Sequence, residues 1–415
     1  MSLRHRQRGV ALIYVAAAIV ALVAVVGLAL DAGHLGLSKA QLQSGSDAAA
    51  LAAAKVLDQT GSKALATAAA NTAFTANTTG YREISNARAG SLSIAVTYSA
   101  TIIPFSPGTE PAAYVRVATS AFNLLSGLTA AVGAAGLSTA ATAVAGPSPT
   151  LSSACNIAPV VVCGNPAAGA PLWGYTAGQL QILKTASGNN NSDYGVGPGN
   201  FQLIRVGGNG ANVVRDNMAG GYAACSDSGT SVETQPGNQV GPVAQGANTR
   251  FGQYSGSMSR ADFPPDVVTD SPAPNLSYVC APQGGACNIK QGARVVTTVA
   301  EIGYSYDGNY IPDIQAGNYD QQPAPNADNG AFLRRELTVP IGDCTTAVNG
   351  QGTIPVLGFA CFFLLQPVVQ QGNQAHMFGE FLTSCNSGGV PGPAPASGPG
   401  PYIIQLYDDS SSPDS

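Results

Sequence analysis

A long uncharged run near the N-terminus is the feature that most constrains this chain. From Gly9 to Leu30 the only ionisable side chain is the phenol of Tyr14. A helix of this length rises about 33 Å, which is enough to cross the ~30 Å hydrocarbon core of a bilayer. A secretory signal has a shorter apolar region and a small-residue cleavage site, and LALDAGH offers no clean site of that kind. We therefore expect a transmembrane helix over residues 9–30.

The charges on either side of this run predict how it is oriented. Arg4, Arg6 and Arg8 precede it, and Asp31 follows it. Basic flanks stay in the cytoplasm under the positive-inside rule. Residues 1–8 are therefore expected to be cytoplasmic, and everything after Asp31 is expected on the other side of the membrane.

The helical pattern does not stop at the end of the apolar run. DAGHLGLSKAQLQSGSDAAALAAAKVL contains no proline and is rich in Ala and Leu, so the same helix is predicted to continue to about Leu57. Small side chains let neighbouring helices approach closely in lipid. The residues that we expect to form the helix-packing face are Ala17, Ala21, Ala24 and Gly27.

The segment RQRGVALIYVAAAIVALVAVVGLALDAGHLGLSKAQLQSGSDAAALAAA resembles the N-terminus of TadG-like (TadE/TadG) proteins of the Tad (Flp) pilus system. The shared pattern is a basic R-x-R-G start, an apolar run, an acidic residue followed by a small one, and a stretch ending in D-A-A-A-L-A. It covers about residues 6–54. The resemblance implies a structural or assembly component of a type IV-like pilus, anchored in the bacterial inner membrane with a periplasmic C-terminal domain. Its implied partners are other pilus subunits, the assembly machinery and the lipid bilayer.

Gly9 is the processing site that a pilin-like mature chain would use. Pilins cut by prepilin peptidase usually carry glutamate five residues after the cleaved glycine, and Tyr14 stands there. This departure favours retention as a membrane protein over incorporation into an extracellular pilus, although both outcomes stay open.

Composition sets the class of the remaining chain. Charged residues make up only 10% of 415, against a usual value of about 25%, while 50 glycines and 28 prolines indicate many turns. The net charge is −5 and no basic block follows the first eight residues, so a nucleic-acid partner is not expected.

All eight cysteines lie after residue 150, and their even number in an exported domain predicts disulfides. The sequence contains no C-x-x-C, and its three histidines are scattered, which argues against a zinc site. Two pairs are close enough to close small loops, but spacing does not fix the pairing. The candidates are Cys155, Cys163, Cys225, Cys280, Cys287, Cys344, Cys361 and Cys385.

The pattern of turns and apolar runs divides the chain after the membrane helix. We expect a second helix over 63–76, strands over 91–101, 112–120 and 137–146, and a short helix over 122–132. Residues 31–147 are thus a helical stalk with a small α/β module, and Pro147 to Pro149 mark a boundary. Residues 148–405 are expected to form a larger disulfide-bonded antiparallel β-rich domain, and 406–415 a disordered tail. The predicted fold class is α+β.

Few residues suggest bound ions or catalysis. Asp307, Asn309 and Asp313 are spaced as weak calcium ligands, but the downstream glutamate of an EF-hand is missing, which favours a plain Asp/Asn turn. Asp227 lies in D-S-G-T-S, a spelling used by aspartic proteases, but no second copy supplies the partner carboxylate. We expect no cofactor and no enzyme activity; a secreted hydrolase would have to act through Asp227.

Aromatic residues in the Gly-rich part leave a second function open. Trp173 and Tyr175 lie in or near polar segments, where exposed rings bind glycans or partners and buried rings cap a β core. The alternative to a pilus component is therefore a tethered surface adhesin or glycan-binding protein, in which the helix serves only as an anchor.

Overall fold

The computed structural model describes residues 8–88, 91–124, 137–185, 199–222, 225–280, 287–323, 329–346, 348–391 and 400–409. The chain forms two compact units. Unit 1 consists of Met1–Gly146 together with Ile404–Ser415, and unit 2 is Pro147–Ile403. Each unit is described by itself.

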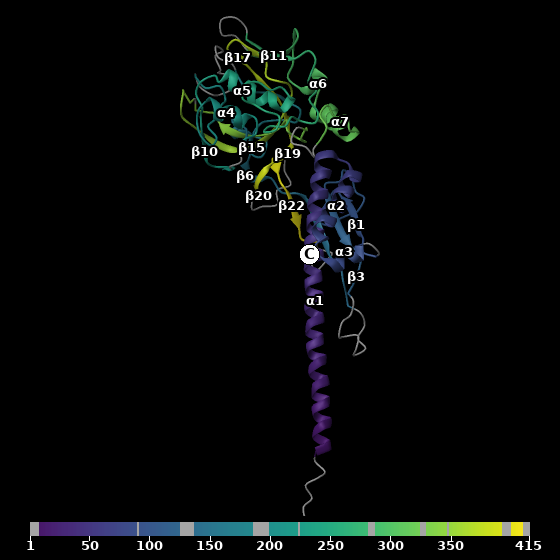
Figure 1. Cartoon of the computed structure of the whole chain (residues 1–415). Helices are drawn as coiled ribbons and strands as arrows, with labels where there is room; N and C mark the ends of the chain where they lie inside the picture. Colours follow the sequence, from purple (N-terminus) through teal and green to yellow (C-terminus); the bar gives the residue numbers. More distant parts are fainter. Residues whose placement is uncertain are drawn as a thin grey trace, which may run out of the picture. The chain divides into compact units, whose positions relative to one another are not determined.

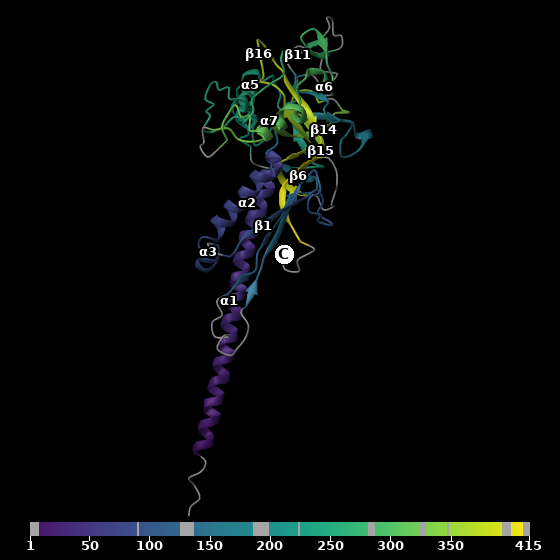
Figure 2. The same cartoon turned by 90° about the vertical axis from the view of Figure 1, so that its right-hand side faces the viewer.

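Unit 1 is built on one continuous helix, α1, which runs from Arg8 to Thr60 (Figure 1). The helix ends where Gly61 takes a positive φ of 64°, and the Ser62 hydroxyl caps α2 (Lys63–Thr78) by accepting from the Leu65 N–H. Both views show α2 packed alongside the upper part of α1, followed by the short α3 (Arg82–Arg88) (Figures 1 and 2). The two long helices expected from the sequence are both present.

A four-stranded sheet covers the helices of unit 1. Its order is β1 (Ile94–Ser99), β2 (Tyr114–Thr119), β5 (Thr142–Pro147) and β22 (Ile404–Tyr407). β2 is antiparallel to both β1 and β5. The three strands expected before residue 147 are thus found. Of the short helix expected over 122–132, the described residues instead form strand β3 (Phe122–Asn123), which pairs with β4 (Ser138–Thr139), and 125–132 lie outside the described residues.

The core of unit 1 depends on small side chains in the second half of α1. Ala49, Ala50, Ala53 and Ala54 are buried against α2 and against Val115 and Val117 of β2. Gly45 marks the closest approach, because a Cβ added there would lie 2.7 Å from Thr78 Cγ2 and 3.1 Å from Phe74 Cε2. Alanine and glycine thus let α1 and α2 pack closely in water, as such residues do in lipid.

The first residues of the expected disordered tail, 406–409, are instead part of the fold of unit 1. Residues Ile404–Tyr407 form β22 beside β5, and Asp409 pairs with Arg116 of β2. The edge of a short sheet offers unpaired backbone groups, and YIIQLY is apolar and aromatic enough to occupy it. Residues 410–415 of the expected tail lie outside the described residues.

Unit 2 is organised around a long central strand, β15 (Thr353–Leu364). Along its main path the sheet has the order β7 (Val162–Gly164), β14 (Glu336–Asp343), β15, β18 (Met377–Leu382) and β8 (Leu180–Lys184), while β10 (Ser231–Glu233) also pairs with β15. Only β7 and β14 pair in parallel among the described strands of this sheet. The predicted antiparallel β-rich domain is therefore confirmed.

The central sheet has a hydrophobic cluster on each face. On one face Phe362 and Leu364 pack with α4 (Ala211–Met218) and α5 (Val240–Asn248). On the other face Phe363 packs with α6 (Val299–Ile302), α7 (Ile311–Ala316) and the π-helical turn η6 (Tyr306–Tyr310). Because both faces are covered, the second half of β15, FACFFL, is a continuous apolar run rather than an alternating one.

Smaller sheets and turns complete unit 2. Pairing is antiparallel in the sheets around β6 and β12 and parallel between β19 and β21. Their bounds are β6 (Leu151–Cys155), β9 (Cys225–Asp227), β20 (Gly388–Pro391), β11 (Leu276–Cys280), β12 (Cys287–Gln291), β13 (Arg294–Val295), β16 (Gln370–Gln371), β17 (Gln374–Ala375), β19 (Ser384–Asn386), β21 (Gly400–Tyr402), η2 (Pro166–Ala168) and η4 (Thr249–Phe251).

Four disulfides cross-link unit 2. They are Cys155–Cys225, Cys163–Cys344, Cys280–Cys287 and Cys361–Cys385, and all eight cysteines are among the described residues. Cys280 and Cys287 close the small loop that their spacing allowed. Cys155 and Cys163 do not pair with each other, because Cys155 lies opposite Cys225 in the β6–β9 pair and Cys163 lies beside the end of β14.

A buried polar network around Arg335 and Asp266 joins segments of the second hydrophobic cluster of unit 2. Arg335 is fully buried, and its guanidinium donates to the carbonyls of Val268, Leu364 and Leu365. Asp266, also fully buried, accepts from the Arg335 backbone N–H at 2.9 Å and from the Tyr310 hydroxyl. Such a network is stable only when its donors and acceptors are satisfied, so it fixes the loops before β14 in one arrangement.

Candidate membrane and assembly segment

The first half of α1 leaves its apolar side chains uncovered. Every large apolar side chain from Leu12 to Leu30 is at least 53% exposed, whereas Leu42 and Leu57 further along the same helix are buried. Such a continuous apolar surface is not stable against water, and it is long enough to span a bilayer. The exposed side chains are Leu12, Ile13, Tyr14, Val15, Ile19, Val20, Leu22, Val23, Val25, Val26, Leu28 and Leu30.

The four residues expected to pack against other helices lie within this segment. At 100° per residue, Ala17, Ala21, Ala24 and Gly27 fall within about one third of the helix circumference. Ala17 and Ala21 are exposed, Ala24 is half-buried and Gly27 is buried. The helix therefore carries a strip of small residues beside its larger apolar side chains.

Polar contacts begin where the apolar segment ends. His34 Nε2 lies 2.8 Å from the Glu83 carboxylate of α3. Further up, Gln43 donates to Asp47 at 2.8 Å and to the Thr142 carbonyl of β5 at 2.7 Å. Burial raises the pKa of Asp47, and the bond from Gln43 opposes that shift. The helix thus changes at about Asp31 from an exposed apolar rod to a folded stalk.

The structure does not assemble the weak calcium candidates into a metal site. Asn309 accepts from the Ser305 N–H at 3.0 Å, and Asp313 accepts from the Asn318 amide at 3.2 Å, so both serve local turns. Among the described residues, no group of three or more His, Cys, Asp or Glu side chains is placed to hold a metal ion.

Asp227, the residue of the hydrolase alternative, lies at the end of β9. Its carbonyl accepts from the Thr230 hydroxyl at 2.6 Å, which closes the turn between β9 and β10. The D-S-G-T-S spelling thus corresponds to a tight turn, in which Gly229 has a positive φ of 82°.

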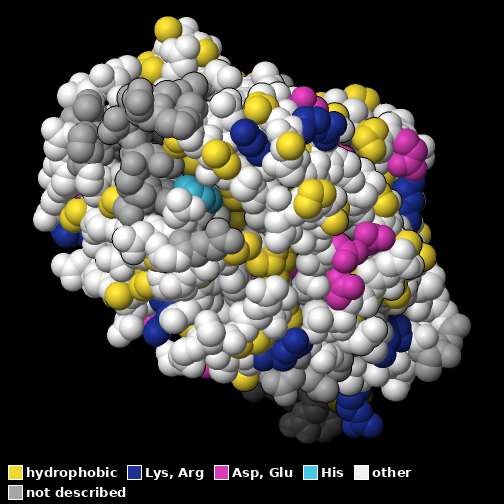
Figure 3. All heavy atoms as spheres, turned by 90° about the horizontal axis from the view of Figure 1, so that it is seen from above, with side chains coloured by type: hydrophobic (Ala, Val, Ile, Leu, Met, Phe, Trp, Pro, Cys, Tyr) yellow, Lys and Arg dark blue, Asp and Glu magenta, His cyan; other side chains and the backbone are white. Residues whose placement is uncertain are grey.

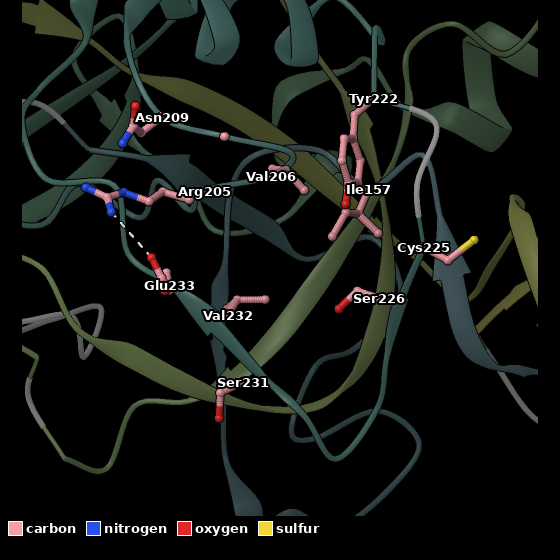
Figure 4. A pocket seen from close by; sticks show the side chains of 11 residues that line it. Ile157, Arg205, Val206, Asn209, Tyr222, Cys225, Ser226, Ser231, Val232 and Glu233 are labelled. Atoms are coloured by element: carbon pink, nitrogen blue, oxygen red, sulfur yellow. Dashed lines mark hydrogen bonds and ion pairs between the residues drawn. The ribbon is translucent and has the colours of Figure 1, made fainter.

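A pocket of about 470 Å³ lies next to this turn, between β10 and the loop before α4 (Figure 4). Arg205 and Glu233 point toward each other on its rim, and their charged groups are 3.3 Å apart. The two side chains therefore neutralise each other's charge. The groups that remain to contact a ligand in the pocket are mainly the side chains of Tyr222, Asn209 and two serines.

The face of the molecule in Figure 3 carries no large patch of one charge sign that would attract an oppositely charged partner. On the face in Figure 3, basic and acidic side chains stand in small separate groups among uncharged polar surface. This distribution agrees with a charged fraction of only 10%.

The sequence pattern does not distinguish Gly45, the glycine at the close contact between α1 and α2, from the other glycines of α1. Gly45 sits in a helical stretch that also contains Gly33 and Gly36, and no spacing distinguishes the glycine that faces Phe74. The importance of such a residue depends on which element packs against it.

An N-terminal helix with a bilayer-length exposed apolar surface, continuing without a break into a folded stalk, defines a membrane-associated protein with a helical anchor segment. Residues 9–56 match the family described as putative Flp pilus-assembly TadE/G-like. The chain therefore carries the TadE/G-like segment at its N-terminus, and it is a pilus-associated membrane component. The family is a pilus-assembly family and not an enzyme family. No curated protein and no solved structure matches the chain.

Proposed function

We propose that this protein is a single-pass structural component of a Tad (Flp, type IV-like) pilus that acts by packing its N-terminal helix against other pilus subunits. The observation that carries the proposal is the split of α1. Its first half exposes apolar side chains continuously, and its second half is locked into unit 1 by Leu42, Ala49 and Ala53. Because α1 is continuous, a partner that fixes its first half also fixes the folded part of unit 1.

The orientation follows from the charges. Arg4, Arg6 and Arg8 keep the N-terminus on the cytoplasmic side of the bacterial inner membrane. Unit 2 then lies in the periplasm, and its four disulfides fit an oxidising compartment. Treating spheroplasts with protease tests this topology. Digestion of unit 2 with survival of the first 30 residues is expected, and protection of unit 2 until the membrane is dissolved contradicts it.

Partner contacts are assigned to the small-residue strip. Van der Waals packing drives helix association in lipid, and it is strongest where small side chains allow close approach. Ala17, Ala21, Ala24 and Gly27 provide such a strip, and large polar side chains at Ala17 and Ala21 are expected to abolish co-purification with pilus components. Unchanged co-purification would exclude this packing role.

Retention in the membrane is the proposed fate of the anchor. The carboxylate that pairs with a neighbour's new N-terminus in processed pilins is absent, since Tyr14 occupies its position after Gly9. Mass spectrometry of the native N-terminus is expected to find Met1 or Ser2. A mature chain starting at Val10 would instead indicate processing and a place in the filament.

A further inference from the structure

A groove in unit 2 lies beside Trp173, the only tryptophan in the sequence. It has a volume of about 880 Å³. One wall is formed by β7, the turn around Trp173 and the start of β8, and the other by β12, β13 and the strand-like segment that leads to Thr298. Backbone hydrogen bonds from Leu180 N–H to the Thr297 carbonyl and from Val299 N–H to the Gly178 carbonyl, each 3.0 Å, join the two walls.

Trp173 is held in this groove in an unusual backbone conformation. Its φ is +49°, a left-handed value that is rare for a bulky residue and concentrates at functional sites. The conformation is fixed by Trp173 N–H donating to the Gly169 carbonyl and by Asn165 N–H donating to the Trp173 carbonyl, at 3.0 and 2.8 Å. Trp173 is only partly buried, so part of the residue stays accessible from the groove that it lines.

Two glycines make room for the indole. A Cβ at Gly358 of β15 would lie 3.0 Å from Trp173 Nε1, and a Cβ at Gly164 of β7 would lie 2.9 Å from Trp173 Cβ. The ring is thus seated directly on the backbone of the central sheet. The surrounding walls are rigid, since Cys163–Cys344 pins the first and Cys280–Cys287 pins the second.

The polar groups of the groove are all uncharged. None of its described lining residues is acidic or basic. The lining instead supplies side-chain amides, which both donate and accept hydrogen bonds, from Asn165, Gln179, Gln181 and Asn288. Gln181 is more than nine-tenths buried, and its one hydrogen bond within the described structure is a long contact of 3.5 Å to the Ile182 carbonyl. Its amide therefore keeps hydrogen-bonding capacity for a group that enters the groove.

We propose that this groove binds an uncharged saccharide, with Trp173 as the stacking platform and the amides of Asn288 and Gln181 as hydroxyl partners. A sugar ring presents an apolar face of C–H groups to an aromatic ring and a rim of hydroxyls that donate and accept. The described lining has no basic side chain with which to recognise an acidic or phosphorylated peptide. The assignment concerns unit 2 alone and stands apart from the membrane role of α1.

The single tryptophan makes the test specific. The full-length protein in a detergent without a sugar head group is titrated with short oligomers of glucose, galactose, mannose or N-acetylglucosamine while the tryptophan emission is recorded. One of these probes is expected to give a saturable change. Asn288→Ala is expected to raise its Kd about fivefold, because one hydrogen bond is lost. Asn209→Ala, the matched change in the pocket of Figure 4, is expected to leave the Kd unchanged.

A second variant keeps the test independent of the fluorophore. Trp173→Phe is expected to weaken binding about tenfold by calorimetry while keeping an aromatic ring in place. The proposal is overturned if no neutral oligosaccharide gives a saturable signal, if only anionic sugars or peptides bind, or if Asn209→Ala weakens binding and Asn288→Ala does not.

Discussion

Arg116 on β2 and Asp409, 293 residues further along the chain, form an ion pair with 2.5 Å between Nη2 and Oδ1. The Asp409 side chain is almost fully buried, and it follows directly on β22, the last strand of the sheet in unit 1. The pair therefore fastens the end of the chain to the stalk that carries the membrane helix. Residues 404–409 thus belong to the same unit as α1 and β2.

Asp409→Asn is expected to destabilise unit 1 by about 3 kcal/mol, because removing one partner of a buried pair leaves the other charge uncompensated. Asp408→Asn is the matched control, since this neighbour is exposed and should change stability by less than about 0.5 kcal/mol. Chemical denaturation of the two variants measures the difference. Equal stabilities would show that the pair does not hold β22 in place.

Gly45→Val is expected to loosen the packing of α1 on α2, because the new side chain would collide with Thr78 and Phe74. Overpacking of this kind costs about 1–3 kcal/mol. Gly33→Ala, on the same helix with open space around it, should instead be neutral or stabilising by up to about 1 kcal/mol. The midpoint of thermal unfolding reports both. A harmless Gly45→Val would contradict the close approach.

The disulfides are expected to differ in their contribution to stability. Cys163–Cys344 joins residues 181 positions apart, whereas Cys280–Cys287 joins residues 7 apart. In the chain-entropy description the long loop contributes about 5 kcal/mol and the short one about 2 kcal/mol. Paired serine substitutions, compared by urea denaturation, test this order. The reverse order would mean that native contacts, rather than chain entropy, determine their value.

Glu380 is expected to make stability depend on pH. It is buried on β18, and burial raises its pKa to about 7 against the bond from the Tyr306 N–H; the nearby charge of Asp307 raises it further. The folded state then holds a proton that the unfolded state releases, so this contribution is complete below about pH 4.5 and is lost as the pH rises to about 7. The loss is on the order of 3 kcal/mol.

Glu380→Gln keeps an acceptor for the Tyr306 N–H and removes the titration. The difference in unfolding free energy between variant and parent should therefore grow in favour of the variant from pH 4.5 to pH 8. Comparing the two proteins cancels the opposite contributions of Lys184 and His376, whose pKa values burial lowers to about 7 and about 4. A constant difference across this range would show that Glu380 titrates normally.

The local sequence pattern predicts many helices and strands of this fold, but it does not predict which distant segments contact each other. The uninterrupted Ala- and Leu-rich stretch predicted α1, and CFFLL predicted a buried strand pinned by Cys361. The pairing of Cys155 with Cys225 depends on β6 and β9 meeting across seventy residues. The return of Ile404–Tyr407 to unit 1 likewise depends on a free sheet edge that no nearby residue reveals.

Trp173 illustrates the same limit at the candidate saccharide groove. The sequence places an aromatic residue in a polar, Gly-rich stretch, a pattern that favours an edge-capping role over a binding role. Only the close approach of Trp173 to Gly164 and Gly358, and the amides brought from β8 and β12, define a groove.

The most direct test of the account is site-specific photo-crosslinking inside the membrane. A photoreactive amino acid is placed at Ala21, on the small-residue strip, and in a separate variant at Val26, which projects from the opposite side of α1. We predict that the Ala21 position crosslinks to other pilus subunits and that the Val26 position crosslinks mainly to lipid. Membrane-inserted protein that gives no protein crosslinks at Ala21, or equal crosslinks at both positions, would contradict assembly through this face of the helix.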